Sequence, residues 1–314
     1  PRRHRRVGLH IAPQGSIMSK VEEITLKGLP ALRLTDASGA TCDVFKYGAH
    51  IATWKSADGI DNLFVSSTAE IGGGKALRGG IPVCWPQFAA KGQYGKHGFC
   101  RTSAEWTVVR TSTEPFPCVV LGLSSSEATK AAWPFDFSLR YAVTIDGPQS
   151  LSTSLTITNP GEAPIEFTGA LHTYFCAEHA GCVQAHGLEG CTFENSAAGG
   201  GMETQSTALL GFEGEVDRIY YQTPPELHLL NLSAGRHMKV LKMGFPDAVA
   251  WNIGKAKAPT LKDLDNFEKY VCLEAGLIGK PYSLPPNASY TAGQTFTAGV
   301  EMPKGKKKAA VEVQ

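Results

Sequence analysis

A histidine, His172, interrupts the apolar stretch 167–175, whose composition is typical of a β-strand. Alternate side chains of a strand share a face, so His172 would lie with Ala170 and Tyr174. A histidine in this position can be a hydrogen-bonded residue of the core. It can also carry protons, because its unperturbed pKa is close to neutrality. The pattern alone leaves both interpretations open.

A glutamate, Glu274, stands near the end of a second apolar stretch, 270–276. An isolated carboxylate is costly to bury. Glu274 is therefore either half of a salt bridge or a desolvated carboxylate that can act as a base. As with His172, the residues around it do not decide between these interpretations.

Two arginines stand among apolar residues with glycine nearby. Arg78 precedes Gly79 in segment 77–88, and Arg101 closes segment 96–101, which Lys96 opens. Glycine lets a ligand or another backbone approach closely. The planar guanidinium offers forked donors that match phosphate or carboxylate oxygens. The arginines are either anion-binding residues or partners in structural ion pairs.

Several familiar catalytic motifs are missing from the sequence. It contains no G-x-S-x-G nucleophile elbow and no G-x-G-x-x-G after a strand. Segment 72–75 is rich in glycine but lacks the rest of a phosphate-binding loop. No C-x-x-C pair occurs among the eight cysteines, which argues against a zinc site and a disulfide framework. Reduced, buried thiols in a cytoplasmic protein are the simpler interpretation.

The charge of the whole chain is +1, which provides no general field for nucleic acid or a membrane surface. No apolar run approaches the ~18 residues of a membrane-spanning helix. The two ends are locally basic: residues 1–20 contain arginines but no acid, and residues 304–314 begin with a cluster of lysines. Each end is either a solvated tail or a functional segment, for organelle targeting at the front or anion binding at the back.

The dominant pattern along the chain has a period of two, which is typical of half-buried strands. Apolar residues occupy the odd positions of 137–146, and 151–158 largely repeats the pattern. Residues 147–150, Gly-Pro-Gln-Ser, form a turn signal between them. Together these segments predict an antiparallel hairpin.

Similar short runs recur, whereas helical patterns are confined to 62–69 and 261–270, each long enough for a turn or two. Many strands and few short helices predict an all-β fold, a large antiparallel β-sandwich. Because no repeat or linker is evident, we expect a single domain over residues 21–303, between basic tails at 1–20 and 304–314.

Seven blocks of sequence carry a resemblance to a known family. They are LRGGIP (77–82), KHGFCR (96–101), WPFDFSLR (133–140), ALHTYF (170–175), EVDRIY (215–220), PDAVAWN (246–252) and VCLEAG (271–276). In this order they resemble the glucose-6-phosphate 1-epimerases, or hexose-6-phosphate mutarotases, of the aldose 1-epimerase superfamily. The resemblance covers residues 29–296 and implies a galactose mutarotase-like β-sandwich that binds sugar on a concave face.

The resemblance also implies roles for individual residues. His172 and Glu274 match the catalytic histidine and glutamate of the family. Arg78 and Arg101 match arginines placed around the substrate phosphate, and Asp217 matches an aspartate that contacts sugar hydroxyls.

The HG pair of the second block carries two further candidates. His97 matches a residue of the binding region, and Lys96 stands where relatives commonly have a glutamine that contacts substrate. A lysine keeps the donors, loses the acceptor and adds charge. Lys96 therefore either strengthens phosphate binding or points to solvent.

The activity that the resemblance implies is exchange of the α and β anomers of a hexose 6-phosphate, with glucose 6-phosphate the expected substrate. Glu274 would take the proton of O1 while His172 protonates the ring oxygen, and the roles reverse when the ring closes. The reaction requires no metal, cofactor or covalent adduct. We expect a cytoplasmic monomer whose only partner is this small molecule.

Two alternatives remain open. In a mutarotase for unphosphorylated aldoses, Arg78 and Arg101 would be structural. A non-catalytic carbohydrate-binding protein is the second, but binding alone needs no matched acid and base. A glycosidase fits less well, because most glycosidases use two carboxylates.

Overall fold

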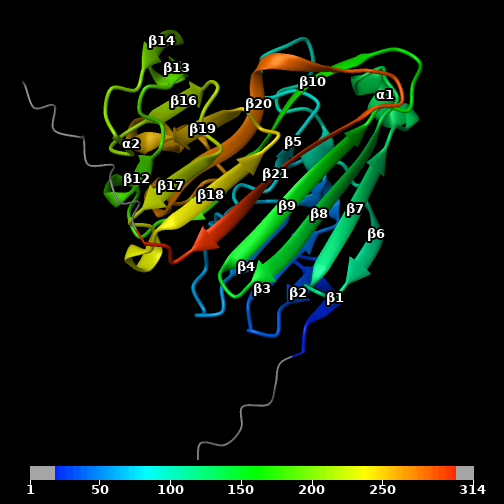
Figure 1. Cartoon of the computed structure of the whole chain (residues 1–314), viewed down its shortest axis with the longest axis horizontal. Coiled ribbons are helices and arrows are strands. Elements are labelled where there is room, and N and C mark those ends of the chain that lie inside the picture. Colours follow the sequence, from blue (N-terminus) through cyan, green and yellow to red (C-terminus); the bar gives the residue numbers. More distant parts are fainter. Residues whose placement is uncertain (1–17, 302–314) are drawn as a thin grey trace, which may run out of the picture.

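The computed structural model describes residues 18–301, whose strands form three antiparallel sheets (Figure 1). Two large sheets pack face to face, and a small sheet closes one end of the sandwich. The prediction of an all-β sandwich is therefore confirmed. The tails predicted at 1–20 and 304–314 lie outside the described residues, apart from 18–20.

The largest sheet has nine strands, and its centre is the predicted hairpin. β8 (Ser138–Gly147) and β9 (Ser150–Thr158) pair antiparallel, with Leu139 opposite Ile157. Their apolar residues are buried at the predicted alternate positions because one face of the hairpin covers the core. From edge to edge the sheet consists of β15 (Leu209–Gly211), β12 (Gln184–His186), β17 (Glu226–Leu230), β18 (Met238–Met243), β21 (Ser289–Ala298), β9, β8, β7 (Cys118–Ser124) and β6 (Thr107–Ser112).

The second large sheet has eight strands and two different faces. In its long strand β20 (Tyr270–Leu284), Val271, Leu273 and Ala275 belong to the core shared with the nine-stranded sheet. Glu274 points the other way. The order is β14 (Gly201–Thr204), β13 (Thr192–Asn195), β16 (Val216–Tyr220), β19 (Asp247–Asn252), β20, β10 (Ile165–Leu171) and β5 (Val83–Cys84), while β11 (Tyr174–Cys176) also pairs with β20.

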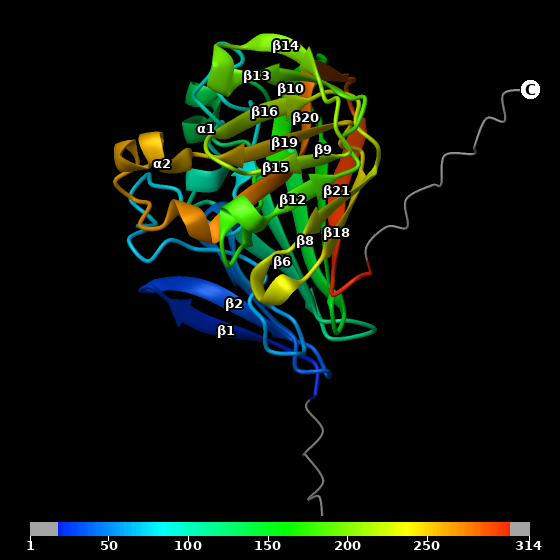
Figure 2. The ribbon, with the colours of Figure 1, turned by 90° about the vertical axis from the view of Figure 1, so that its left-hand side faces the viewer.

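The small sheet consists of β1 (Lys20–Leu26), β2 (Leu29–Thr35), β3 (Thr41–Phe45) and β4 (Ile51–Lys55), paired in chain order. Figure 2 shows its blue strands β1 and β2 beneath the two larger sheets. Its inner residues join the same core: Trp54 of β4 stacks on Phe296 of β21 with ring centroids 6.0 Å apart. Through this contact the small sheet is tied to the nine-stranded sheet.

Within residues 18–301, helix is limited to short pieces. They are α1 (Glu127–Ala132), α2 (Gly254–Lys257) and the 3-10 turns Tyr47–Ala49, Cys100–Thr102, Ala180–Cys182, Ser196–Ala198, Ser233–Gly235, Ala258–Thr260 and Phe267–Lys269. None of these helices has the length and apolar character needed to cross a bilayer.

The helix predicted at 62–69 is wrong. Leu63 and Val65 instead form bridges to Phe175 and Gly79, so tertiary pairing overrides the local pattern. Of the helix predicted at 261–270, only the turn Phe267–Lys269 forms.

A buried histidine supports the glycine turn that follows Arg78. His50 is fully buried, and its Nε2 lies 2.9 Å from the carbonyl oxygen of Gly79. Burial lowers the pKa of His50 from its ordinary value to about 4. The folded protein therefore holds this imidazole neutral at pH values where an unfolded chain would protonate it.

We predict that the substitution His50→Asn lowers the free energy of unfolding more at neutral pH than in mild acid. As the pH falls below about 6.5, the unfolded wild-type chain takes up a proton that the native state does not, so the wild type loses stability that the variant cannot lose. The cost of the substitution should be smaller by roughly 2 kcal/mol at about pH 5 than at about pH 7.5. Urea unfolding of both proteins at both pH values measures it, and an equal cost would contradict the prediction.

Candidate active site

A cavity of about 500 Å³ opens on the face of the eight-stranded sheet that points away from the core. Strands β16, β19 and β20 supply its floor, and the loops before β6 and after β19 contribute its walls. All of the predicted site residues line it: Arg78, Lys96, His97, Arg101, His172, Asp217 and Glu274. The structure therefore brings together residues that lie up to 196 positions apart in the chain.

His172 lies at a break between β10 and β11, where the sequence pattern predicts one continuous strand. Its backbone N–H donates to the carbonyl of Pro82 at 3.1 Å, and the N–H of Thr173 donates back to Leu171 at 3.0 Å. From the opposite sheet, the side-chain amide of Gln294 donates to the Thr173 hydroxyl at 3.0 Å. The break is thus held by buried hydrogen bonds, and it turns the imidazole of His172 toward the cavity.

Aromatic rings fix the plane of this imidazole. It stacks on Tyr174 at 4.7 Å and 8°, and it meets Trp251 edge-on at 5.7 Å and 88°. Trp251 lines the cavity but was not among the predicted site residues. The alternation within 247–252 could have found it, because Trp251 shares a face with Val249, which also lines the cavity.

Glu274 lies in β20 opposite Val249, and only 1% of its surface is exposed. Its Oε1 is 3.1 Å from Nδ1 of His172. Despite this distance the contact lacks the alignment of a hydrogen bond, and Nδ1 of His172 has no hydrogen-bond partner among the described residues. The other carboxylate oxygen, Oε2 of Glu274, is also buried without a partner there. Buried polar atoms without partners are rare in folded proteins, so this pair calls for a functional explanation.

Burial shifts the two groups in opposite directions. It raises the pKa of Glu274 well above its ordinary value, and the charge of Asp217 adds to this. It lowers the pKa of His172 well below its ordinary value, helped by His97 and the cations Arg78 and Arg101. Both shifts favour neutral forms, a carboxylic acid beside a neutral imidazole. The pair then holds one transferable proton together with a group that can accept one.

Arg78 lines the cavity and is also half of an ion pair. Its Nε and Nη2 lie 3.2 Å and 3.1 Å from Oδ2 of Asp263, and its Nη1 donates to the Tyr174 hydroxyl at 3.2 Å. The ion-pair interpretation of this arginine is therefore confirmed, and anion binding by it stays a prediction. The turn that positions it is tight: a Cβ on Gly80 would lie 2.0 Å from the Ile51 carbonyl oxygen.

Arg101 and Lys96 differ from the other cations of the cavity. Lys91 and Lys257 are paired with Glu194 and Glu215, as Arg78 is with Asp263. Among residues 18–301, no carboxylate comes within 4.0 Å of the Arg101 guanidinium or the Lys96 amine. Arg101 donates only to the Lys96 carbonyl, at 3.3 Å, and its buried Nε has no partner there.

His97 lies in the same loop and is held in one tautomer. The N–H of Ala89 donates to its Nδ1 at 3.2 Å, so the neutral ring carries its proton on Nε2. Burial lowers the pKa of His97 to about 3, with further lowering by Arg101, Lys96 and Arg78. This histidine is therefore a neutral hydrogen-bond donor near the acid–base pair, with its ring 5.8 Å from that of His172.

Asp217 supplies an unpaired acceptor on the cavity floor. It is half-buried, and its carboxylate has no hydrogen-bond or ion-pair partner among residues 18–301. Burial raises its pKa, and the nearby charge of Glu215 adds to the effect. A carboxyl group of this kind can accept hydrogen bonds from hydroxyl groups of a ligand.

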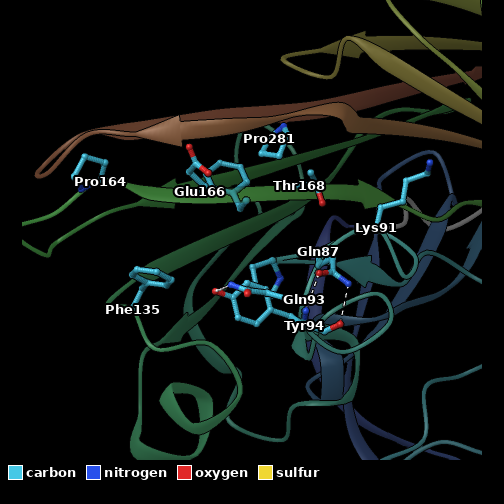
Figure 3. A pocket seen from close by; sticks show the side chains of 12 residues that line it. Gln87, Lys91, Gln93, Tyr94, Phe135, Pro164, Glu166, Thr168 and Pro281 are labelled. Carbon is cyan, nitrogen blue, oxygen red and sulfur yellow. Dashed lines mark hydrogen bonds between the residues drawn. The ribbon is translucent and has the colours of Figure 1, made fainter.

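Figure 3 shows a second cavity, of about 400 Å³, between the loop around Tyr94 and strands β10 and β20. Glu166 points into it, but its lining contains neither histidine nor arginine. Because an acid–base pair is found only in the first cavity of these two, that cavity is the candidate active site.

The fold places the chain in the class of galactose mutarotase-like β-sandwiches. A Salmonella typhimurium protein provisionally described as a mutarotase superposes with a TM-score of 0.82 at 23% identity, over 90% of this chain and 94% of that one. A galactose mutarotase-like protein from Clostridium acetobutylicum gives 0.71 at 13% identity, over 90% and 98% of the two chains.

The chain belongs to the aldose 1-epimerase family, whose sequence model matches residues 30–297. A relative from Cenchrus ciliaris is 31% identical over 277 residues, which are 85% of this chain and 84% of the relative. One from Escherichia coli (strain K12) is 32% identical over 234 residues, or 72% and 76%. Both carry the provisional name of a glucose-6-phosphate 1-epimerase. The resemblance noted in the sequence is confirmed, and the protein is an epimerase of this family.

The loop that carries Lys96, His97 and Arg101 depends on a glycine. Gly98 has φ +63°, and a Cβ there would lie 2.0 Å from the Trp85 carbonyl oxygen. We predict that Gly98→Ala lowers the free energy of unfolding by at least roughly 1–3 kcal/mol, because the left-handed backbone and the collision both oppose a side chain.

The matched control is Gly95→Ala in the same loop, where an added Cβ meets nothing within 4 Å. It should change stability by no more than about 0.5 kcal/mol, as exposed substitutions usually do. Urea unfolding of both variants measures the difference. Equal stability of the two would show that the approach of the loop to Trp85 is not needed.

Proposed function

We propose that the protein interconverts the α and β anomers of a hexose 6-phosphate, with glucose 6-phosphate as substrate. The observation that carries the proposal is one cavity that combines a buried acid–base pair, His172 and Glu274, with two cations, Arg101 and Lys96. Neither cation has a carboxylate partner within residues 18–301. The provisional names of the two relatives support the same substrate.

In the proposed reaction, the single proton of the pair lies on His172 when substrate is bound, so Glu274 is the carboxylate. Glu274 then removes the proton of O1 while His172 protonates the ring oxygen. The bond from C1 to the ring oxygen breaks, and C1 becomes the carbonyl carbon of an open chain. Rotation about the C1–C2 bond and the reverse transfers close the ring on the other face. Each cycle returns every proton to its starting group, so no net acid, base or redox equivalent is consumed.

The electrostatics of the cavity bear on the open-chain stage of this reaction. After opening, Glu274 is protonated and His172 is neutral, which is the arrangement that burial favours. The protein therefore stabilises the open-chain stage of the reaction. A phosphate dianion beside Arg101 would offset the cations that lower the pKa of His172, and would so favour the protonated imidazole needed for opening.

The phosphate serves as a handle remote from C1. Arg101 and Lys96 would bind it, while Arg78, held by Asp263, would contribute donors of fixed orientation. Asp217 and His97 offer an acceptor and a donor for sugar hydroxyls. Fixing the ring at both ends lowers the entropy lost in reaching the reactive geometry.

The alternatives predict different features. A mutarotase for free aldoses needs no unpaired cation, which argues for a phosphorylated substrate here. A protein that only binds carbohydrate needs no desolvated acid–base pair, because burying one lowers stability without strengthening binding to hydroxyls.

We predict that Glu274→Gln and His172→Asn each reduce enzyme-catalysed anomer exchange of glucose 6-phosphate by about 10²–10⁴-fold, the usual contribution of a general acid or base. Saturation-transfer NMR on the two anomeric protons measures the exchange. The matched control is Glu166→Gln, a carboxylate of the second cavity, which should leave the rate unchanged. Near wild-type exchange in Glu274→Gln or in His172→Asn would remove that residue from the mechanism.

We further predict that Arg101→Gln lowers kcat/KM for glucose 6-phosphate by roughly 10–100-fold and leaves that for free glucose within about twofold, because a charge-assisted bond contributes about 1.5–3 kcal/mol. Lys257→Gln, which removes a cation already balanced by Glu215, should have a much smaller effect. An equal loss on both sugars in Arg101→Gln would make that arginine structural and not a phosphate handle.

A further inference from the structure

A thiol lies directly beside the acid–base pair. Cys272 precedes Glu274 by two positions in β20, so the two side chains share the face of the strand that points away from the core. His172, Cys272 and Glu274 are all buried, and one ligand atom from each lies within 4.8 Å of the others. The proposed reaction uses two of these residues and leaves the third without a role.

We propose that His172, Cys272 and Glu274 form a binding site for zinc, which blocks the cavity and is not needed for the reaction. The imidazole nitrogen, the thiolate sulfur and the carboxylate oxygen are the three kinds of protein ligand that Zn²⁺ takes. Three ligands leave the fourth tetrahedral position for a water molecule on the cavity side. The lack of a C-x-x-C pair argued against a zinc site, but that motif detects only ligands that are close in the sequence. The ligands proposed here come from two segments about 100 residues apart.

The geometry is close to what zinc requires. Bond lengths of about 2.0–2.3 Å in a tetrahedron place neighbouring ligand atoms roughly 3.3–3.8 Å apart. Nδ1 of His172 and Oε1 of Glu274 are 3.1 Å apart, and the Cys272 sulfur lies within 4.8 Å of a ligand atom of each of these residues. Side-chain shifts of about 1 Å would bring the three atoms to the spacing of a tetrahedral zinc site. Oε2 of Glu274 is buried and has no hydrogen-bond partner among residues 18–301, so a lone pair is free to bind a cation.

The charges also balance. Zn²⁺ with one thiolate, one carboxylate and a neutral imidazole is neutral as a unit, which suits a buried site. The positive charge of Arg78 nearby is offset by Asp263. On binding, three metal–ligand bonds form, and the proton of the Cys272 thiol and the proton held by the acid–base pair pass to solvent.

Sulfur and nitrogen ligands select the metal. Mg²⁺ and Ca²⁺ prefer sets made entirely of oxygen, whereas imidazole and thiolate suit zinc and its spectroscopic substitute Co²⁺. A bound metal would occupy the lone pairs that exchange protons with the sugar. Zinc should therefore inhibit in competition with the substrate.

The first test is a Co²⁺ titration of the wild-type protein, which does not depend on the proposed function. We expect one equivalent of Co²⁺ to produce a thiolate-to-metal charge-transfer band in the ultraviolet and the intense visible bands of four-coordinate cobalt. Cys272→Ala should abolish the charge-transfer band. Cys42→Ala, which removes an equally buried thiol from the small sheet, should keep it. Absence of the band in the wild type, or its survival in Cys272→Ala, would overturn the proposal.

The second test uses anomer exchange and rests on the proposed function for its readout. Zinc should inhibit the wild type and Cys42→Ala alike, with reversal by a chelator, and Mg²⁺ should not. Each protein is normalised to its own activity in the presence of chelator. The inhibition constant of zinc should then be about 10–100-fold higher for Cys272→Ala than for the wild type. Equal inhibition in both variants would overturn the site. A protein with the cobalt spectrum but without epimerase activity would contradict the proposed function and leave the metal site standing.

Discussion

The close contact between His172 and Glu274 is the constraint on which the rest of the structure depends, because the fold must bury and orient two ionisable groups. Two ionisable groups lie 3.1 Å apart and are almost entirely buried, and an unpaired buried charge would destabilise the fold by several kcal/mol. Burial favours the neutral form of both groups, and aromatic rings pack against the imidazole. A strand break anchored by Pro82 and by the Gln294–Thr173 hydrogen bond orients the histidine, and the first third of the long strand β20 carries the glutamate.

The cations around this pair differ in whether a carboxylate partner offsets their charge. Arg78 is ion-paired with Asp263 and oriented by Tyr174, so part of its charge near the acid–base pair is offset. Arg101 and Lys96 keep their charge, and they lie together in one loop at the wall of the cavity. The cavity therefore has a nearly neutral reactive part and a positive part. That division suits a ligand with an uncharged ring and a charged substituent.

Local pattern was sufficient for much of the fold and for little of the site. The hairpin β8–β9 follows from strict alternation and a turn of Gly, Pro, Gln and Ser, because both signals act within twenty residues. By contrast, nothing local relates His172 to Glu274, and only the resemblance to a family paired them. The partners Asp263 and Gln294 and the break at Thr173 escaped prediction, since each depends on contacts between distant segments. The same cause explains the failed helix at 62–69, whose backbone pairs with Phe175 and Gly79.

Strand β20 faces the core with Leu273 and the cavity with Glu274, and these residues are neighbours in the chain. A shift of its pairing by one residue would exchange the two faces, burying a carboxylate in the apolar interior and presenting leucine to the ligand. An insertion or deletion between Val271 and Gly276 would therefore destabilise the fold as well as displace the glutamate. Single substitutions, and changes in the loops at the rim of the cavity, keep the register of this strand. A change in substrate or chemistry is therefore easier to reach through them.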